Sequence, residues 1–437
     1  MSVEYKESPL GMIPSDWEIV KSSSVFELIH GYQFRDFDFT ETGLPIVKIG
    51  QINRNGEIDM NGCSFFSSDR AEEFADKRIF NGDVLMALTG ATLGKSCWVS
   101  GLENPVYQNY RVGKFVPHDE KVLSKQFLYF LVGSPLALDQ IMAKINSGAQ
   151  GNVGKSDFEK LKIPLPPLPE QQKIAEILST VDAKIEVIDQ QITETQALKK
   201  GLMQQLLTGK LSVIEKRTLS SAEMKDSPLG EIPKSWEVLI LGAVTEQIKD
   251  GTHATHKEVL GGIPLLSAKD IRNGRIYIPN DCRKLSQEDF NSIHKNFKIK
   301  NGDVLLTVVG SIGRVAVIEN YDDNYTFQRS VGYIRLNNEN NPYFFKQYFQ
   351  SDIFLKQLLL RSNASAQAGV YLGELGKIPI VSIPLVEQIK IAEILDSVDT
   401  KLEVLSEKKT HYQELKQGLM QHLLTGKIRV NNLIAQI

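Results

Sequence analysis

The sequence has few cysteines, no long hydrophobic run and almost no excess of charge, and each shortage excludes a class of protein. The 437 residues include three cysteines, Cys63, Cys97 and Cys282, which lie far apart and form no C-x-x-C pair. A disulfide framework or a zinc ribbon is therefore not expected, and the predicted location is the reducing cytoplasm. The longest apolar runs, such as FLYFLV at 127–132, are too short to cross a membrane. The formal net charge is −3, so any contact with nucleic acid would have to use local basic patches.

Motifs of common catalytic and metal sites are also missing. No G-x-S-x-G, H-E-x-x-H or Walker motif is present. GATLGK at 90–95 has too few residues between its glycines for a phosphate loop, and GSIGR at 310–314 again ends in a basic residue. Both stretches are predicted to be glycine turns that present a cation, either as a structural turn or at a DNA backbone. HATH at 253–256 lacks a Cys or acidic partner at metal spacing, so no zinc site is predicted.

One stretch resembles a catalytic signature. NPYF at 341–344 is similar to the Asn-Pro-Pro-Tyr signature of adenine amino-methyltransferases, but no Gly-rich strand-to-helix motif for S-adenosylmethionine accompanies it. Asn is a common N-cap residue and Pro fits the first helical turn. We therefore predict that Asn341 caps a helix, and that the chain has no catalytic, cofactor-binding or metal-binding residue.

What the sequence does contain is an internal repeat that runs through nearly the whole chain. Four stretches recur in the same order, at offsets between 217 and 220 residues, so only small insertions separate the two copies. The pairs are SPLGMIPSDWEIV at 8–20 with SPLGEIPKSWEVL at 227–239, NGDVLMALTGATLG at 81–94 with NGDVLLTVVGSIG at 301–313, EQQKIAEILSTVDAKIEVI at 170–188 with EQIKIAEILDSVDTKLEVL at 387–405, and GLMQQLLTGK at 201–210 with GLMQHLLTGK at 418–427.

The first part of each copy is predicted to be β-rich. Asn55-Gly56 and Asn273-Gly274 are typical of hairpin tips, and the Asn-Gly-Asp stretches at 81–83 and 301–303 precede short apolar strands. A proline cluster at 163–172 then predicts an extended lead-in and the start of a helix.

The second part of each copy is predicted to be one long helix, because apolar residues recur every three or four positions. A helix over 170–207 would be about 57 Å long, which is more than one small domain buries, so the two helices are predicted to pack on each other in antiparallel fashion. The alternative is that each helix packs on its own β domain. Gly209 and Gly426 are predicted to end the helices. We call the residues at these three- and four-residue steps, which would face the other helix, the seam. They are Ile174, Leu178, Val181, Ile185, Ile188, Ile192, Thr195, Leu198, Leu202 and Leu206 in the first copy, and Ile391, Leu395, Val398, Leu402, Leu405, Lys409, Tyr412, Leu415, Leu419 and Leu423 in the second.

The expected fold is α+β, with two repeated β-rich domains separated by two long helices that form an antiparallel coiled coil with pseudo-twofold symmetry. The predicted boundaries are 1–165 for the first domain, 166–210 for the central helix, 211–226 for a linker, 227–383 for the second domain, 384–427 for the C-terminal helix and 428–437 for a tail.

The duplicated set of motifs resembles the specificity subunit of type I restriction–modification systems. The resemblance rests on SPLGEIPKSWEV, DGTHAT, GIPLL, NGDVLL, IPLPPLPEQQKIAEIL and GLMQQLLTGK. It implies that each β-rich part is a target-recognition domain that reads half of a bipartite, asymmetric site in double-stranded DNA. It also implies that the helices set the spacing and dock two modification (methyltransferase) subunits, and that restriction subunits, the ATP-dependent translocase and nuclease, join them. S-adenosylmethionine, ATP and magnesium would then bind the partner subunits, and this chain would catalyse nothing.

Base readout in the major groove requires Arg, Lys, Asn or Gln side chains. Solvated surface charge is the competing interpretation for every candidate. Two rival functions also remain: a catalytically active adenine methyltransferase with a duplicated recognition region, and a coiled-coil adaptor that does not bind DNA. The candidates near predicted turns are Lys48, Gln51, Lys95 and Arg111 in the first domain, and Lys269, Arg272, Arg314 and Arg329 in the second.

Overall fold

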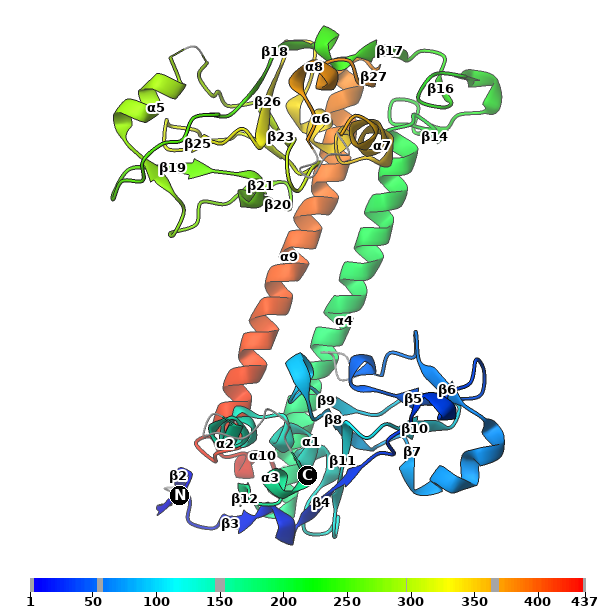
Figure 1. Ribbon diagram of the computed structural model, residues 1–437, viewed down its shortest axis with the longest axis vertical. Coiled ribbons are helices and arrows are strands. Elements are labelled where there is room, and N and C mark those ends of the chain that lie inside the picture. The colour runs from blue at the N-terminus through cyan, green and yellow to red at the C-terminus, as the bar shows by residue number, and fades with distance from the viewer. Residues whose placement is uncertain (1–3, 53–57, 146–153, 296, 363–368, 435–437) are drawn as a thin grey trace. The chain divides into compact units, whose positions relative to one another are not determined.

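The chain folds into two compact units. Unit 1 comprises Met1–Gln190 together with Ser406–Ile437, and unit 2 comprises Gln191–Leu405. Unit 1 is therefore built from both ends of the chain, and the two termini lie in it together, whereas unit 2 is continuous in sequence (Figure 1). The structure, a computed structural model, describes residues 4–52, 58–145, 154–295, 297–362 and 369–434.

Unit 1 contains two four-stranded sheets. One is antiparallel, in the order β4-β11-β8-β9, and the other has the order β6-β5-β10-β7, in which β5 and β10 are parallel. Helix α1 (Lys125–Val132) packs on the antiparallel sheet and is followed by α2 (Pro135–Ile145). The strands are β4 (Phe26–His30), β5 (Leu44–Val47), β6 (Ser64–Phe66), β7 (Arg78–Ile79), β8 (Val84–Ala87), β9 (Ser96–Trp98), β10 (Val106–Gln108) and β11 (Val112–Pro117).

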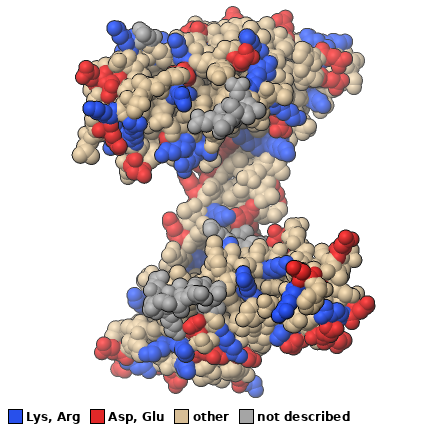
Figure 2. Space-filling view, in the orientation of Figure 1, with Lys and Arg blue, Asp and Glu red and all other residues tan. Residues whose placement is uncertain are grey.

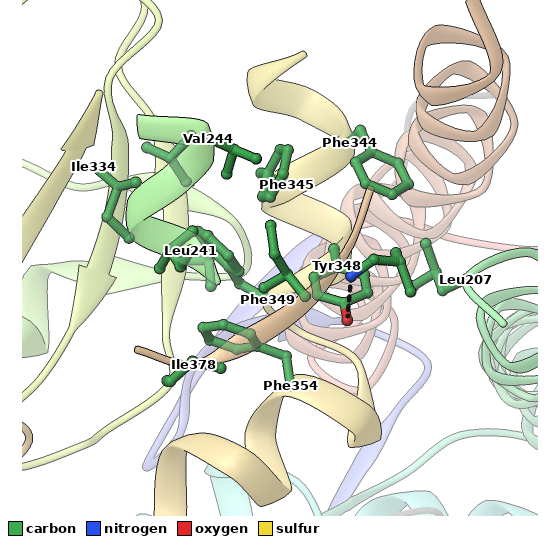
Figure 3. Packing of buried hydrophobic residues seen from close by; sticks show 14 of the residues in the cluster. Leu207, Leu241, Val244, Ile334, Phe344, Phe345, Tyr348, Phe349, Phe354 and Ile378 are labelled. Atoms are coloured by element: carbon green, nitrogen blue, oxygen red, sulfur yellow. Dashed lines mark hydrogen bonds between the residues drawn. The ribbon is translucent and has the colours of Figure 1, made fainter. Parts of the chain in front are cut away.

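Unit 2 repeats this arrangement. Its antiparallel sheet has the order β18-β26-β23-β24, and its second sheet, β22-β19-β25, again contains one parallel pair, β19 with β25. Helices α6 (Pro342–Tyr348) and α7 (Asp352–Leu360) supply aromatic side chains to the core, where Phe344, Tyr348 and Phe354 are buried in one cluster with Leu207 (Figure 3). The strands are β18 (Thr245–Asp250), β19 (Ile263–Leu266), β22 (Lys284–Leu285), β23 (Val304–Thr307), β24 (Val315–Val317), β25 (Thr326–Phe327) and β26 (Val331–Leu336).

The predicted turns of the β-rich parts are present where the structure describes them. Asn273 and Gly274, with φ of 51° and 74°, form the tip between β20 (Ile271–Arg272) and β21 (Arg275–Ile276), as the Asn-Gly pair predicted. Asn55-Gly56 lies outside the described residues. The Asn-Gly-Asp stretches also precede strands β8 and β23 as expected, with Gly82 and Gly302 at positive φ.

Two helices of 39 residues each, α4 (Leu168–Leu206) and α9 (Leu385–Leu423), pass through both units. In unit 1, Asp182 of α4 bonds to Lys416 of α9 over 2.6 Å, and in unit 2, Lys199 of α4 bonds to Asp399 of α9 over 2.6 Å. The two ion pairs occupy equivalent positions of the repeat, with the roles of the helices exchanged. The predicted antiparallel pairing is therefore confirmed within each unit.

Lys409, which stands at the seam position matched by Ile192, also joins the helices. Its Nζ lies 2.5 Å from Asp189 Oδ1, so its charge is neutralised across the helix pair and does not simply extend to solvent. Going from Asp182 to Asp189 moves seven residues forward in α4, and going from Lys416 to Lys409 moves seven residues back in α9. Unit 1 thus keeps one heptad register between the helices.

The seam prediction is wrong at one equivalent pair of positions. Leu198 and Leu415 are 53% and 40% exposed, and the next residue of each helix, Lys199 or Lys416, makes the interhelical ion pair instead. A helix with 3.6 residues per turn drifts away from a strict 3.5-residue repeat, which moves these leucines out of the seam.

The ends of the long helices belong to the cores of the two units. Ile174, Leu178 and Leu423 are buried in the core of unit 1 that α1 and β4 help to form. Leu206, Ile391 and Leu395 are buried in the corresponding core of unit 2. The helices therefore pack on each other and, at their ends, also on the β-rich parts, so both sequence interpretations hold in different places. Of the other seam residues, Val181 and Val398 are buried, while Ile185, Leu202, Leu402 and Leu419 are half-buried.

The repeated GLMQ-LLTGK stretches are docking elements. Gly209, after the end of α4, has φ of +71°, and a Cβ there would lie 2.3 Å from Pro233 Cγ and 3.0 Å from Trp236. Gly426, after the end of α9, has φ of +69°, and a Cβ there would lie 2.4 Å from Pro14 Cδ. Each helix thus ends in a left-handed glycine, as predicted, and each glycine is pressed onto an Ile-Pro-x-x-Trp motif. Unit 1 receives the end of α9, and unit 2 receives the end of α4.

We expect Gly209→Ala and Gly426→Ala each to lower the free energy of unfolding by about 1–3 kcal/mol, because a side chain there meets both backbone strain and a proline ring. Chemical denaturation followed by circular dichroism measures this. Gly201→Ala and Gly418→Ala are matched controls, because these glycines lie inside the helices with open space around a Cβ. The controls should raise stability by about 0.5–1 kcal/mol. Equal effects at Gly201 and Gly209 would show that the helix end does not dock.

A buried tryptophan closes each unit. Trp17 Nε1 donates to Glu170 Oε2 over 2.9 Å in unit 1, and Trp236 Nε1 donates to Glu387 Oε2 over 3.2 Å in unit 2. Glu170 and Glu387 lie in the first turns of α4 and α9. Each bond therefore ties the start of one long helix to the Ile-Pro-x-x-Trp motif that also receives the end of the other.

The two buried carboxylates differ in their counterions. Arg429 donates from Nε and Nη2 to the Glu170 carboxylate, over 2.7 and 2.9 Å, and its Nη1 and Nη2 also donate to Asp16 over 2.9 and 2.8 Å. If the offset of 217 residues is extended past the last repeated stretch, Ser212 corresponds to Arg429. Glu387 has no ion pair with any residue that the structure describes. Among the described residues, the glutamate bonded to the tryptophan therefore has a buried salt bridge in unit 1 and none in unit 2.

The described residues between and after the repeats are structured. Within the predicted linker, strands β13 (Leu211–Ser212) and β14 (Arg217–Thr218) form a hairpin, and Val213 is buried in the core of unit 2. Within the predicted tail, Arg429 makes the bonds given above, and Val430 is 2% exposed in the core of unit 1. The repeat ends before these residues, so it carried no signal for their packing.

The cysteines are buried thiols, and Cys63, Cys97 and Cys282 form no disulfide. None of the helices in the described part of the chain has both the length and the apolar character that crossing a membrane requires.

Candidate nucleic-acid interface

A three-residue turn before β11 organises one edge of unit 1. We call residues 109–111 and their equivalents 328–330 in unit 2 the central turns. Backbone hydrogen bonds join the central turn of unit 1 to the loop after β4, to the end of β5, where the next loop begins, and to the loop after β8, so three separate segments meet there. The bonds run from Asn109 N to Val47 O (3.0 Å), from Tyr110 N to Tyr32 O (2.9 Å) and from Leu88 N to Arg111 O (3.0 Å).

The central turn of unit 2 is held in the same way, by loops after β18, β19 and β23. Ser330 adds a side-chain contact, since its Oγ accepts a bond from Ala268 N over 3.1 Å. Because each bond has a counterpart in the other unit, the arrangement is a property of the repeat. The bonds run from Gln328 N to Leu266 O (2.8 Å), from Arg329 N to Thr252 O (3.0 Å) and from Val308 N to Ser330 O (3.0 Å).

Two glycines allow the loops to approach this closely. A Cβ on Gly31 would lie 2.2 Å from the carbonyl oxygen of Gln108, and a Cβ on Gly251 would lie 2.1 Å from that of Phe327. These backbone contacts leave no room for any side chain. Gly251 is the glycine of the DGTHAT stretch, so part of that motif has a steric explanation.

The structure places all eight predicted DNA-binding residues on the central turns or on the loops bonded to them. Arg111, Lys269 and Arg329 are exposed, and their side chains make no hydrogen bond or ion pair with any described residue. Arg272 is exposed too, with its Nε donating to Lys269 O over 2.7 Å. Lys95 is half-buried on the loop after β8. The candidates thus form one set in each unit.

Three of the eight candidates brace the loops internally. Lys48 Nζ donates to Ser64 Oγ over 2.7 Å and lies 4.4 Å from the centre of the Phe39 ring, and Gln51 Oε1 accepts from Lys48 N over 2.9 Å. Arg314 Nη1 donates to the carbonyl oxygens of Ala268 and Ile271, over 3.3 and 3.2 Å. These side chains hold the loop after β5 or β19 in place. They were predicted from residue type and from their place near turns, and neither property distinguishes a side chain that braces a loop from one that contacts DNA.

Aromatic residues at the edge of unit 1 were missed by the sequence argument, which searched only for cations and amides. The Tyr110 ring stacks on His30 with centroids 5.2 Å apart, and Tyr110 is 49% exposed. Tyr32, on the neighbouring loop, is also exposed. The repeat contained a signal, because Tyr110 aligns with Arg329, and a tyrosine that replaces an arginine is more typical of an exposed position than of a core.

The HATH stretch fixes the loop after β18. His256 bonds through Nε2 to Thr252 Oγ1 (2.9 Å) and lies with Nδ1 3.0 Å from Asp289 Oδ1, while His253 lies 2.7 Å from Asp250. The two histidines therefore face different carboxylates. This loop bonds to Arg329 through the Thr252 carbonyl, so the histidine chain also steadies the central turn of unit 2.

Basic side chains gather at one edge of unit 2. Figure 2 shows Lys and Arg at the edge where β20 and β21 lie. The exposed cations of this segment are Lys269, Arg272 and Arg275, of which Arg275 pairs with Glu403 of α9 over 2.5 Å. The local positive charge that the sequence required of any nucleic-acid site is therefore present beside the central turn.

The NPYF stretch is a helix start, as predicted. Asn341 Oδ1 accepts hydrogen bonds from Tyr343 N and Phe344 N, over 2.9 and 3.0 Å, at the N-terminus of α6. Its own backbone N–H donates to Gln388 Oε1 over 2.7 Å, and in unit 1 Ser124 N donates to Gln171 Oε1 over 2.9 Å. Asn341 thus occupies a structural position that both units share.

We expect Asn341→Ala to lower the free energy of unfolding by about 1 kcal/mol, because two helix N–H groups lose their acceptor. Asn341→Asp should retain most of the stability, since Asp is an equally good cap. Thermal unfolding of the full chain measures both. If Asn341→Ala leaves stability unchanged but abolishes methyl transfer by the folded, assembled complex, Asn341 is not merely a cap.

The duplicated architecture has counterparts among known proteins. A family model described as Type I restriction modification DNA specificity domain matches residues 14–197 and again 233–417. The putative type I restriction enzyme MjaX specificity subunit of Methanocaldococcus jannaschii is 28% identical, over 98% of this chain and 97% of that protein. The type I restriction enzyme EcoBI specificity subunit of Escherichia coli is 25% identical, over 88% and 80%.

A solved structure shares the fold. The crystal structure of a Type-I restriction-modification system S subunit from M. genitalium matches with a TM-score of 0.55 at 17% identity, over 97% of this chain and 99% of that one. The family model matches twice, with the same spacing as the internal repeat, so each copy of the repeat corresponds to one copy of the family domain.

Proposed function

Because the chain belongs to the family of type I restriction modification DNA specificity proteins, we propose that each unit reads one half of a bipartite site in double-stranded DNA through its central turn and the loops bonded to it. The observation that carries this proposal is the recurrence of the same loop arrangement in both units, with all eight candidate residues on it. Two similar reading surfaces on one chain suit two half-sites. Because the loops differ in sequence, the two halves of the site would differ, which makes the site asymmetric.

The long helices support a second role, that of spacing the half-sites and docking the catalytic subunits. Interhelical ion pairs at equivalent positions, such as Asp182 with Lys416, keep the pair in register in each unit. In the proposed complex, two modification subunits bind this chain, and restriction subunits join them in the cytoplasm. S-adenosylmethionine, ATP and magnesium would bind those partners, and this chain would supply recognition without catalysis.

A domain exchange tests the reading role. Residues 26–117, from β4 through β11, carry the central turn of unit 1 and its loops but not Trp17 or the long helices. We expect their replacement by the matching span of another family member to change one half of the methylated sequence. The other half and the gap should stay the same, as measured by methylation sequencing of cells that carry all subunits. A change in both halves would contradict separate reading.

The two rival functions have their own tests. Crosslinking of radiolabelled S-adenosylmethionine to the isolated chain would support an active methyltransferase, and we expect none. A DNA mobility shift by the assembled complex that weakens with salt would exclude an adaptor that does not touch DNA.

A further inference from the structure

The central turns of the two units hold different residues in equivalent places. Position 329 of unit 2 is an arginine, and the equivalent position 110 of unit 1 is a tyrosine. The backbone N–H of each donates to the carbonyl of the loop after β18 or β4, at Thr252 or Tyr32, over 3.0 and 2.9 Å. The backbone of the turn is therefore held in the same way in both units, but the side chain that it carries differs.

Arg329 is held at its backbone and free at its side chain. Bonds from its own N–H and from both neighbouring residues tie the turn to three loops, of which the loop after β18 is further fixed by the hydrogen bonds of His256 to Thr252 and Asp289. The residue is exposed, and its guanidinium makes no hydrogen bond or ion pair in the parts of the chain that the structure covers. A base-reading group requires this combination, because a rigid support places the fork and no internal partner competes for it.

The exposed cations of unit 2 lie in two different places, which suggests two roles: contact with bases and contact with phosphates. Arg329 lies on the central turn, whereas the exposed cations Lys269 and Arg272 lie on the flanking loop after β19. Contacts to phosphates position a protein on DNA and carry no sequence information, while contacts to base edges in the groove specify the sequence. We assign the second role to the central turn and the first to the flanking loop. An arginine fork matches the O6 and N7 acceptors of guanine in the major groove.

We propose that Arg329 reads a guanine in the half-site of unit 2, and that position 110/329 is a specificity-determining position of the repeat. In unit 1, Tyr110 stacked on His30 offers no such fork, so the corresponding base pair is read differently. The proposal rests on the DNA-reading role given above.

The test uses the full chain assembled with its modification subunits and DNA carrying the recognised site. We expect Arg329→Ala to reduce discrimination at one G·C pair of the unit 2 half-site by about 5- to 150-fold, while the other positions and the gap stay unchanged. Arg329→Gln should shift the preference at that pair toward adenine, because glutamine pairs with the N6 and N7 of adenine. Neither a purely structural role nor a phosphate contact would produce that shift.

Lys269→Ala serves as the matched control. It should weaken binding to all sequences alike, without altering the methylated motif. The slope of log affinity against log salt should fall in magnitude by about 1, as expected for the loss of one phosphate contact. The Arg329 side chain makes no hydrogen bond or ion pair with any described residue, so its variants should unfold at the wild-type temperature.

The outcomes separate this inference from the proposed function. If the wild-type complex methylates no bipartite motif, the proposed function fails. If the wild-type motif is present and Arg329→Ala and Arg329→Gln both keep it at every position, or lose affinity evenly as Lys269→Ala does, then Arg329 reads no base and the inference is overturned.

Discussion

Inserting seven residues into each long helix, after Gln190 in α4 and after Leu405 in α9, should lengthen the unspecified middle of the recognised sequence by about three base pairs. Both insertions fall at the boundary between the units, so the contacts within each unit are kept. Seven residues preserve the heptad register and add about 10.5 Å of helix at 1.5 Å per residue. At about 3.4 Å per base pair, the added length corresponds to three base pairs.

The bases at the two ends of the site should be unchanged, because the central turns are untouched. Methylation sequencing of cells that carry the variant and its partner subunits measures both features at once. An insertion in α4 alone is the control, since it moves Asp182 or Lys199 out of register with its partner on α9 and should reduce activity without selecting a new gap. An active double insertion with the old spacing would mean that the partner subunits, and not the helices, set the distance.

Arg429→Ala destabilises unit 1 by about 3–5 kcal/mol. Glu170 is 1% exposed, and Arg429 is its cation. Removal of the guanidinium leaves a buried carboxylate without a counterion, which is strongly destabilising. The hydrogen bonds to Glu170 raise the pKa of Arg429, and those from Arg429 lower the pKa of Asp16, which agrees with a strong pairing. Hydrogen exchange of peptides from unit 1 should quicken, while peptides from unit 2 should exchange as before.

Glu387, the equivalent of Glu170 in unit 2, supplies a control in which the change in stability should have the opposite sign. Burial raises the pKa of Glu387, against the opposing effect of the Trp236 hydrogen bond. A carboxyl whose pKa is raised on folding costs stability above that pKa, so unit 2 should gain stability as the pH falls through the raised pKa toward 4.5, the ordinary value. Glu387→Gln should therefore stabilise unit 2 at neutral pH and remove this pH dependence. Destabilisation by Glu387→Gln at pH 7 would show that the carboxylate has a counterion in solution.

The repeat was sufficient to predict the two β-rich parts, the long helices with their glycine ends and the antiparallel pairing, because these depend on local turns and on apolar spacing. It failed where a side chain's partner is distant in sequence. Leu198 stood in the predicted seam, but the helical drift and Lys199 decided its exposure. Lys48 and Arg314 had the right chemistry for DNA, yet their partners, such as Ser64, could not be identified before the loops were folded.

The residues that distinguish the two units were the hardest to foresee. Arg429 lies beyond the last repeated stretch and Ser212 lies in what seemed a linker, so neither had a pattern to reveal it. The pairing of Trp17 with Glu170 did have a signal, since both residues recur in the second copy as Trp236 and Glu387. Polar residues that a repeat retains in both copies are therefore worth pairing with one another before any partner outside the chain is sought.

The way the chain composes unit 1 has a consequence for its synthesis on the ribosome. Unit 2 is complete once Leu405 has been made, but unit 1, whose first strands emerge earliest, still lacks the segment that carries Gly426 and Arg429. At roughly 5–20 residues per second, the last 32 residues require about 2–6 seconds more. The first unit to appear is thus the last to close, because Glu170 gains its Arg429 partner only after unit 2 has been made. A polypeptide that terminates before Gly426 and Arg429 keeps an open unit 1, so the closure of this unit requires translation past these two residues.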